Sequence, residues 1–224
     1  MNITIVLFNN QIYGLTKGQY SPTSEQGKVT KSTPFGSLET PFNPISLALG
    51  AEATFVARTH DMDRKHMQET FRRAHAHKGA AFVEIYQNCN VFNDGAFEKI
   101  TAKDNRPDQL VPLVHGQPIV FGAEAQHGVV LDPDGRLRLV EVADVGEAAI
   151  LVHDEQRDDP GLAFQLSRLA RGPYEPTPIG VFRAVERSEY GAEMSRQLLE
   201  AHERRGSGDL TSLLASGGTW TVDA

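Results

Sequence analysis

The chain begins with the stretch that decides its fold, Ile3-Thr4-Ile5-Val6-Leu7-Phe8-Asn9-Asn10-Gln11-Ile12-Tyr13-Gly14-Leu15-Thr16-Lys17-Gly18-Gln19. Its apolar, β-branched start is typical of a buried strand in a parallel sheet, and this run stops abruptly at two adjacent asparagines. Ligands of open α/β sheets gather at the carboxyl ends of the strands. Oxygen-bearing amides at that point, followed by Tyr, Gly, Thr and Lys, indicate a site for a hard cation and an anionic cofactor.

Strands and helices alternate in the first part of the chain. The predicted elements are a strand at 2–8, a helix from Asn43-Pro44 to Gly50, a strand at 53–57, a helix from Asp61 or Asp63 to about Gly79, and a strand at 80–86. Strand, helix, strand, helix, strand predicts a right-handed parallel α/β layer.

A long polar segment separates the first strand from the first helix. It covers residues 9–42, well beyond the roughly 15 residues at which structureless segments of compact domains are usually functional or disordered. Tyr13, Tyr20, Pro22 and Phe35 are spaced along it like anchors, which favours a functional loop.

The sequence changes character from about residue 100. Asp132-Pro133-Asp134-Gly135 predicts a turn between strand-like runs at 119–130 and 137–142. Helical periodicity follows within 145–170, and then an extended segment at 177–183 and an exposed helix at 194–205. Residues 206–224 are expected to form a weakly ordered tail, in which Leu213, Leu214 and Trp220 are available to dock on a neighbour.

The composition of the chain argues against several classes of protein. The chain has 224 residues, 40% of them hydrophobic and 23% charged, as in an ordinary soluble globular protein of one large domain, or one domain with an appendage. A net charge of -7 argues against nucleic acid as a partner. No apolar run approaches the roughly 20 residues of a membrane span, and Met1-Asn2 lacks the basic start of a signal peptide, so we expect the cytoplasm. The single cysteine, Cys89, excludes an internal disulfide and suits a reducing compartment.

The asparagine stretch also carries a family resemblance. From Asn9 to Gln19, through Tyr20-Ser21-Pro22-Thr23-Ser24 to Thr30-Lys31-Ser32-Thr33-Pro34, the sequence resembles the β subunit of 2-oxoacid:ferredoxin oxidoreductases, most closely the 2-oxoglutarate type. The resemblance extends to about residue 140. It implies an α/β fold with part of a parallel sheet of thiamine diphosphate-binding type in residues 1–100, an additional C-terminal α+β segment with a hairpin and helices in 101–205, and a tail in 206–224.

The resemblance implies a role for each residue of the loop. In the family, the second asparagine and a main-chain carbonyl two residues later hold Mg²⁺ together with an upstream Gly-Asp-Gly motif. Carried over, Asn10 and Ile12 bind Mg²⁺, and the segment Tyr13, Gly14, Leu15, Thr16 binds thiamine diphosphate. Lys17 lies near the substrate and coenzyme A, and is expected to pair with the distal carboxylate of 2-oxoglutarate. Without the family pattern, paired asparagines would more often form a plain turn, and Lys17 would be a solvated lysine.

Cys89 has two interpretations. A single cysteine after a strand is most often a small buried hydrophobe. In the family, a Gln-Pro-Cys-x-x-x-Asn type segment places the last ligand of a [4Fe–4S] cluster here, although this sequence has Asn88 where Pro is common. A cuboidal cluster needs about four thiolates, so one cysteine cannot hold it. We expect an N-terminally truncated chain in which the Mg²⁺ and cluster ligand sets are incomplete.

The histidines are expected to be structural. His60, His66, His75 and His77 lie in a charged helical region without a partnering cysteine pair, which is more typical of a solvated helix face than of a zinc site.

The implied activity is oxidative decarboxylation of a 2-oxoacid to its acyl-CoA, with electrons passed to ferredoxin. A partner α subunit would bind the pyrimidine end of the cofactor, and this fragment alone would be inactive. Leu15-Thr16-Lys17, where pyruvate enzymes tend to have Asn-Thr-Gly, favours 2-oxoglutarate over a pyruvate-type enzyme. Two further alternatives are a catalytically inactive truncated subunit that serves as an assembly or binding module, and a dinucleotide-binding α/β domain. No G-x-G-x-x-G follows a strand, which disfavours the last.

Overall fold

The computed structural model describes residues 1–169, 175–218, 220 and 222. The chain divides into two compact units, one of residues 2–187 and one of Met1 with residues 188–224. Among the described residues, no helix is long and apolar enough to cross a membrane.

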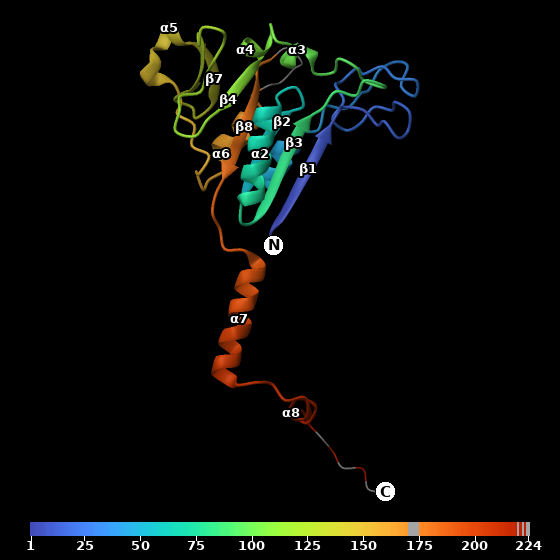
Figure 1. Ribbon diagram of the computed structural model, residues 1–224, viewed down its shortest axis with the longest axis vertical. Coiled ribbons are helices and arrows are strands. Elements are labelled where there is room, and N and C mark those ends of the chain that lie inside the picture. Colours follow the sequence, from blue (N-terminus) through green and yellow to red (C-terminus); the bar gives the residue numbers. More distant parts are fainter. Residues whose placement is uncertain (170–174, 219, 221, 223–224) are drawn as a thin grey trace. The chain divides into compact units, whose positions relative to one another are not determined.

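A five-stranded sheet forms the centre of the larger unit (Figure 1). Its strands, in spatial order, are β1 (Ile3–Asn9), β3 (Ala80–Tyr86), β2 (Phe55–His60), β8 (Thr177–Ala184) and β4 (Leu110–Leu113). The first three are parallel, which confirms the predicted layer. β8 pairs antiparallel with β2, and β4 runs parallel to β8. The structure therefore differs from the expected boundary near residue 100, because the later part of the chain completes the same sheet.

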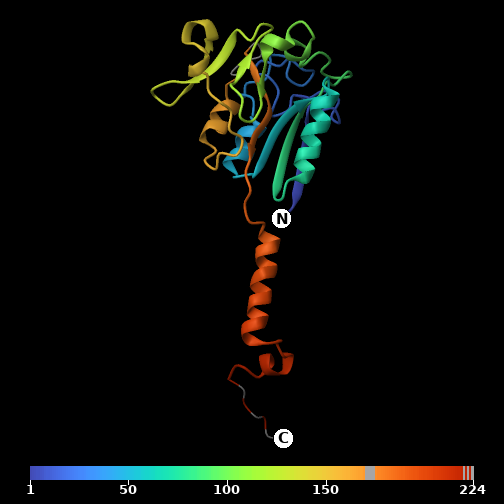
Figure 2. The same ribbon diagram turned by 60° about the vertical axis from the view of Figure 1, so that its left-hand side comes forward.

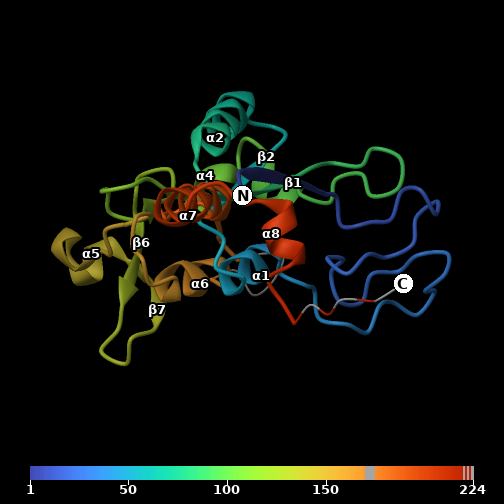
Figure 3. The ribbon, with the colours of Figure 1, turned by 90° about the horizontal axis from the view of Figure 1, so that it is seen from below.

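Helices cover both faces of this sheet. Helix α2 (Arg64–Ala76) packs along β2 and β3 on one face (Figure 2), while α1 (Pro44–Gly50) and α6 (Gly161–Ser167) lie on the other (Figure 3). Each face has its own apolar core. The α1/α6 core contains Ile45, Leu49, Val56, Val111, Ile119, Leu166 and Phe182, and the α2 core contains Phe55, Ala74, Val83, Ile85 and Val181.

The predicted helix starts are confirmed by their caps. Asn43 accepts a hydrogen bond from the Ser46 N–H at 3.0 Å, and Pro44 occupies the first turn of α1. Asp63, rather than Asp61, caps α2 by accepting from the His66 N–H at 3.0 Å. These caps satisfy N–H groups that the first helical turn leaves without partners.

Strand β1 is less buried than its apolar sequence predicts. It pairs with β3 and forms one edge of the sheet, and Ile3, Ile5 and Phe8 are 44%, 51% and 58% exposed. Asn9, its last residue, is the exception at 5%. The expectation of a buried strand was wrong for this chain because β1 lies at the edge of the sheet, beyond the two apolar cores that the helices cover.

The region after residue 100 contains the predicted hairpin, but less of the segment 145–170 is helical than predicted. β6 (His127–Leu131) and β7 (Leu137–Glu141) form a hairpin around the predicted turn, joined by β5 (Val120–Phe121). Between the end of α5 (Val142–Val145) and residue 169, only a 3₁₀ turn (Glu147–Ala149) and α6 are helical, because the segment between them pairs with extended chain: the Leu151 N–H donates to the Val129 carbonyl. Residue 170 lies outside the described residues.

The remaining helices are short or belong to the smaller unit. They are α3 (Glu98–Thr101), α4 (Arg106–Gln109), α5 (Val142–Val145), α7 (Tyr190–Arg205) and α8 (Leu210–Leu214). α7 matches the predicted exposed helix, while α8 gives the predicted tail a capped helical turn, since Asp209 accepts from the Ser212 N–H. Leu213, Leu214 and Trp220 are exposed.

Acidification is expected to destabilise the folded chain through its buried histidines. Burial lowers the pKa of His60 and His153, with a further contribution to His60 from Arg106, so both stay neutral in the folded state while the unfolded chain takes up protons below about pH 6.5. The free energy of unfolding should be insensitive to these groups above pH 7. It should fall as the pH drops from about 6.5, by up to about 1.4 kcal/mol per pH unit for each histidine.

Urea unfolding at a series of pH values measures this dependence. His153→Gln should flatten the slope between pH 6.5 and 5, because it removes one of the histidines whose pKa burial lowers. His75→Gln, at an exposed position, is the matched control. An unchanged slope in His153→Gln would show that burial of His153 is not the cause.

Candidate functional site

The carboxyl ends of the three parallel strands meet at one edge of the sheet. Asn9 is in register with Tyr86, and Tyr86 with His60. The segment after β1, residues 10–43, and the segment after β3, residues 87–97, therefore emerge side by side (Figure 1). We call these two segments the loop cluster.

Two consecutive asparagine turns open the loop cluster. The side-chain oxygen of Asn9 accepts from the Gln11 N–H at 3.2 Å, and that of Asn10 accepts from the Ile12 N–H at 3.3 Å. Gln11 has a left-handed backbone with φ 55°, and Ile12 is buried. The second turn places the Asn10 side-chain oxygen next to the backbone N–H of Ile12, the residue whose carbonyl is the other predicted Mg²⁺ ligand.

Residues 13–19 form a closed loop. Tyr13 and Gln19 make a bridge, with the Tyr13 N–H donating to the Gln19 carbonyl at 2.8 Å and the Gly18 N–H to the Tyr13 carbonyl at 3.0 Å. Lys17 and Gly18 reverse the chain with φ of 65° and 97°. A left-handed lysine is uncommon, and such strain is often found at functional sites.

The tip of this loop has free hydrogen-bond donors. Among the described residues, the backbone N–H groups of Gly14, Leu15 and Thr16 find no acceptor. Leu15 is fully exposed, and the Thr16 hydroxyl donates to the Tyr13 carbonyl at 3.3 Å. Successive exposed N–H groups are a common binding arrangement for anionic oxygens.

The turn that contains Cys89 packs against the same loop. The Asn93 N–H donates to the Cys89 carbonyl at 2.9 Å, and the ring of Phe92 lies over Gly14 and Gly18. A methyl group at Gly18 would come within 3.2 Å of that ring, so a glycine allows this close approach. Cys89 itself is half-buried and unpaired.

Asn93 forms hydrogen bonds with both segments of the loop cluster. The sequence did not predict it as a site residue. Its amide donates to the Asn10 carbonyl at 2.9 Å, and its oxygen accepts from the Lys28 ammonium at 2.6 Å. The only signal in the sequence was its place at the end of the Cys-x-x-x-Asn segment. Asn93 therefore connects the segment after β3 to the predicted Mg²⁺ turn and to a second lysine.

A buried polar chain lies beneath the asparagine turns, and it too was missed. The Asn9 amide donates to Glu84 Oε1 at 2.8 Å, and Arg58 Nε donates to Glu84 Oε2 at 2.8 Å. Both charged residues are buried, in adjacent strands β3 and β2. The signal in the sequence was a lone glutamate within the apolar run 80–86.

The structure thus brings the predicted residues into one cluster. Asn10, Ile12, Tyr13, Gly14, Leu15, Thr16 and Lys17 lie in a continuous loop, and the Cys89 turn contacts it through Phe92 and Asn93. The Lys17 side chain is exposed, as expected for a group that meets a ligand arriving from solvent.

Mg²⁺ and an iron–sulfur cluster fit these residues differently. The Asn10 oxygen and the Ile12 carbonyl are hard donors, and Mg²⁺ usually takes few ligands from protein and the rest from phosphate and water. By contrast, no group of three or more His, Cys, Asp or Glu in the described part of the chain is arranged to hold a metal. Cys89 supplies one thiolate where a cluster needs about four, so these residues do not by themselves form a cluster site.

Two histidines of the predicted charged helical region lie on the sheet side of α2, and they do not form the solvated helix face that the sequence predicted. His66 shares a 2.8 Å hydrogen bond with the Thr59 hydroxyl, and His77 shares one of 2.8 Å with the Thr54 hydroxyl. Burial lowers the pKa of both rings. They stabilise the contact between α2 and the sheet.

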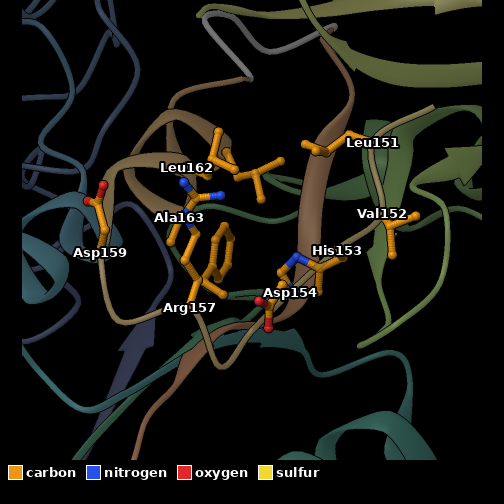
Figure 4. Close-up of a pocket in the computed structure, with 10 residues that line it drawn as sticks. Leu151, Val152, His153, Asp154, Arg157, Asp159, Leu162 and Ala163 are labelled. Atoms are coloured by element: carbon orange, nitrogen blue, oxygen red, sulfur yellow. The ribbon is translucent and has the colours of Figure 1, made fainter. Parts of the chain in front are cut away.

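Two cavities lie away from the loop cluster. One of about 60 Å³, lined by His153, Asp154 and Arg157 among others (Figure 4), has room for only a few water molecules. His153 makes a 2.8 Å hydrogen bond to the Val181 carbonyl and has a structural role there. A wider depression of about 660 Å³ lies at the amino end of β2, next to Phe55, Arg73 and Glu155. Neither contains a predicted site residue.

Known proteins similar to this chain include thiamine pyrophosphate enzymes and oxidoreductase subunits. Residues 1–85 match the thiamine pyrophosphate enzyme C-terminal TPP-binding domain, which confirms the predicted fold class. The chain is 52% identical, over its whole length and 60% of the relative's, to 2-oxoglutarate oxidoreductase subunit KorB of Mycobacterium tuberculosis. It is 44% identical to the 2-oxoacid:ferredoxin oxidoreductase subunit beta of Saccharolobus solfataricus over 94 residues, 42% of this chain and 31% of that protein.

A solved structure is also similar. It is that of the 2-oxoglutarate:ferredoxin oxidoreductase from Magnetococcus marinus with 2-oxoglutarate, coenzyme A and succinyl-CoA bound, with a TM-score of 0.63 and 28% identity over 97% of this chain and 59% of that chain. The chain thus spans about three fifths of the length of this protein and of the Mycobacterium relative.

Proposed function

Because this chain is a relative of the β subunits of 2-oxoacid:ferredoxin oxidoreductases, we propose that it supplies half of a Mg²⁺–thiamine diphosphate site in a 2-oxoglutarate:ferredoxin oxidoreductase. Such an enzyme oxidatively decarboxylates 2-oxoglutarate, transfers the acyl group to coenzyme A and passes electrons to ferredoxin. The observation that carries the proposal is the pair of asparagine turns beside exposed backbone N–H groups.

Asn10 and Ile12 are the proposed protein ligands of Mg²⁺. The Asn10 oxygen now accepts one hydrogen bond, from the Ile12 N–H, and an amide oxygen has a second lone pair for a cation. The bridging Asn93 amide holds the backbone at Asn10. A ligand pair fixed in this way loses little conformational freedom when the ion binds.

The loop from Tyr13 to Thr16 is the proposed diphosphate contact. The N–H groups of Gly14, Leu15 and Thr16 have no acceptor within the described part of the chain and are suited to phosphate oxygens. When bound, thiamine diphosphate supplies the carbanion that attacks the 2-oxo carbon and the electron sink for decarboxylation; the chain's own residues bind and orient it.

Exposed apolar side chains in the loop cluster support the proposal that a partner subunit binds there. Leu15, Phe35 and Leu38 are 100%, 99% and 85% exposed. All three belong to the segment after β1, and large apolar side chains exposed in one segment are suited to an interaction surface. We assign that surface to an α subunit that completes the cofactor site. The single cysteine suits a reducing compartment, and we place the complex in the cytoplasm.

Cys89 is proposed as one thiolate ligand of a [4Fe–4S] cluster whose other ligands are not among the described residues. Its support is its position, half-buried in a turn that contacts the proposed cofactor loop.

Lys17 is the proposed partner of the distal carboxylate of 2-oxoglutarate. Lys17→Ala in the assembled enzyme should raise KM for 2-oxoglutarate by about ten- to a hundredfold, as expected for loss of a charge-assisted hydrogen bond. KM for pyruvate, which has no distal carboxylate, should change little. Steady-state kinetics with both substrates measures the difference.

The matched control is Lys31→Ala. Lys31 is an exposed lysine in the same loop cluster, and its removal should leave the KM values for 2-oxoglutarate and pyruvate unchanged. Equal effects of Lys17→Ala on both substrates would contradict the assignment of 2-oxoglutarate and favour a pyruvate-type enzyme.

A further inference from the structure

We infer that Glu84 is a positioning residue that fixes the orientation of the Asn9 side-chain amide and thereby shapes the turn that presents Asn10 and Ile12. The inference concerns the shape of the turn, and it rests on the proposed function only for what that turn binds.

Glu84 has no freedom to turn away from Asn9. It is fully buried in β3, in register with Leu7 on one side and Arg58 on the other. One carboxylate oxygen accepts from Arg58 and the other from Asn9, both at 2.8 Å. Arg58 in turn donates to the Pro178 carbonyl at 3.1 Å, and its guanidinium lies 5.0 Å from the centre of the Tyr86 ring.

The chemistry of a carboxylate decides which way the Asn9 amide faces. An ionised carboxylate only accepts hydrogen bonds, so the Asn9 NH₂ group must point toward Glu84. The Asn9 oxygen then points the other way, where it accepts from the Gln11 N–H at 3.2 Å and from the Thr23 hydroxyl at 2.7 Å. The left-handed conformation of Gln11 is held by the first of these bonds.

Replacing Glu84 by glutamine reverses this polarity. Arg58 only donates, so the glutamine oxygen would stay with Arg58 and the glutamine NH₂ would face Asn9. Asn9 must then rotate its own oxygen toward the glutamine and its NH₂ toward the Gln11 N–H. Two donors would face each other, and the first asparagine turn would open.

Hydrogen exchange tests this on the chain itself, without cofactor. In Glu84→Gln, the amide hydrogens of Gln11 and Ile12, followed by NMR, should exchange about tenfold faster than in the wild type. Ile85→Val is the control, because it alters a buried neighbour in the same strand without touching the polar chain. Glu84→Gln also leaves the buried Arg58 without its counter-charge, so exchange of the β2 and β3 amides is measured as well. Acceleration at Gln11 and Ile12 beyond that of the β2 and β3 amides supports the inference, and equal acceleration throughout overturns it.

A second substitution restores the hydrogen bond in the reverse direction. In Asn9→Asp with Glu84→Gln, the new carboxylate accepts from the glutamine NH₂, and its other oxygen still accepts from Gln11 and Thr23. Exchange at Gln11 and Ile12 should return to within about threefold of the wild type. The double variant remains a test if Glu84→Gln alone does not fold. A folded double variant with slow exchange supports the inference, and one that exchanges fast or fails to fold overturns it.

The assembled enzyme separates this inference from the proposed function. There, Glu84→Gln should raise the KM for thiamine diphosphate at limiting Mg²⁺ while kcat at saturating cofactor is largely kept, and the double variant should recover the KM. If the turn opens in the exchange experiment but cofactor affinity is unchanged, the proposed function fails and the positioning role of Glu84 remains.

Discussion

Arg58→Met should destabilise the folded chain by about 3–5 kcal/mol, the cost of leaving one member of a buried ion pair uncompensated. Arg58 is 3% exposed and Glu84 is fully buried, so the carboxylate would remain without its charged partner. The variant also loses the hydrogen bond to the Pro178 carbonyl, which joins β2 to β8. Urea unfolding followed by circular dichroism measures the loss.

Two further variants test whether the loss of stability in Arg58→Met comes from the buried charge. Arg72→Met removes an exposed arginine paired with Glu69 on the surface of α2, and it should change stability little. Arg58→Met combined with Glu84→Gln should recover part of the loss, because no charge stays buried. If the single variant were no less stable than Arg72→Met, the buried pair would not support the sheet as described.

Asn10→Ala should weaken Mg²⁺-dependent binding of thiamine diphosphate at least about a hundredfold, since it removes a direct ligand and outer-shell changes alone cost ten- to a hundredfold. Stability should be nearly unaffected, because the Asn10 side chain makes a single hydrogen bond at the start of the loop. Calorimetric titration of the complex with its partner subunit, at fixed Mg²⁺, measures the affinity.

Asn90→Ala, at an exposed asparagine of the neighbouring turn, is the control and should bind as the wild type does. Asn10→Asp keeps an oxygen in place and should retain most of the affinity. Unchanged affinity in Asn10→Ala would rule out Asn10 as a Mg²⁺ ligand and favour the alternative of an inactive binding module.

The local parts of the structure could be predicted from the sequence, and the long-range parts could not. The caps by Asn43 and Asp63 depend on residues three positions apart, so the pattern alone predicts them. The place of β8 in the sheet depends on pairing between segments more than a hundred residues apart in the sequence, such as Arg58 with Gly180, and β4 is placed in turn by pairing with β8. No local pattern encodes such a pairing.

The same distinction holds for the site. The loop from Asn10 to Lys17 is continuous, so a resemblance in sequence was sufficient to predict it. The contributions of Asn93 and Glu84 require that β3 lies beside β1, which brings residues more than seventy positions apart into contact. The lone glutamate in an apolar strand was a visible signal, but its partners were not.

The exposed edge of β1 has a consequence for the behaviour of the chain in solution. The run Ile3–Phe8 contains no charged residue and no proline, which are the usual means by which edge strands avoid pairing with other chains. Short, uncharged segments of high β-propensity are also the typical nuclei of aggregates. The chain on its own is therefore prone to self-association through β1, and its colloidal stability depends on keeping that edge covered.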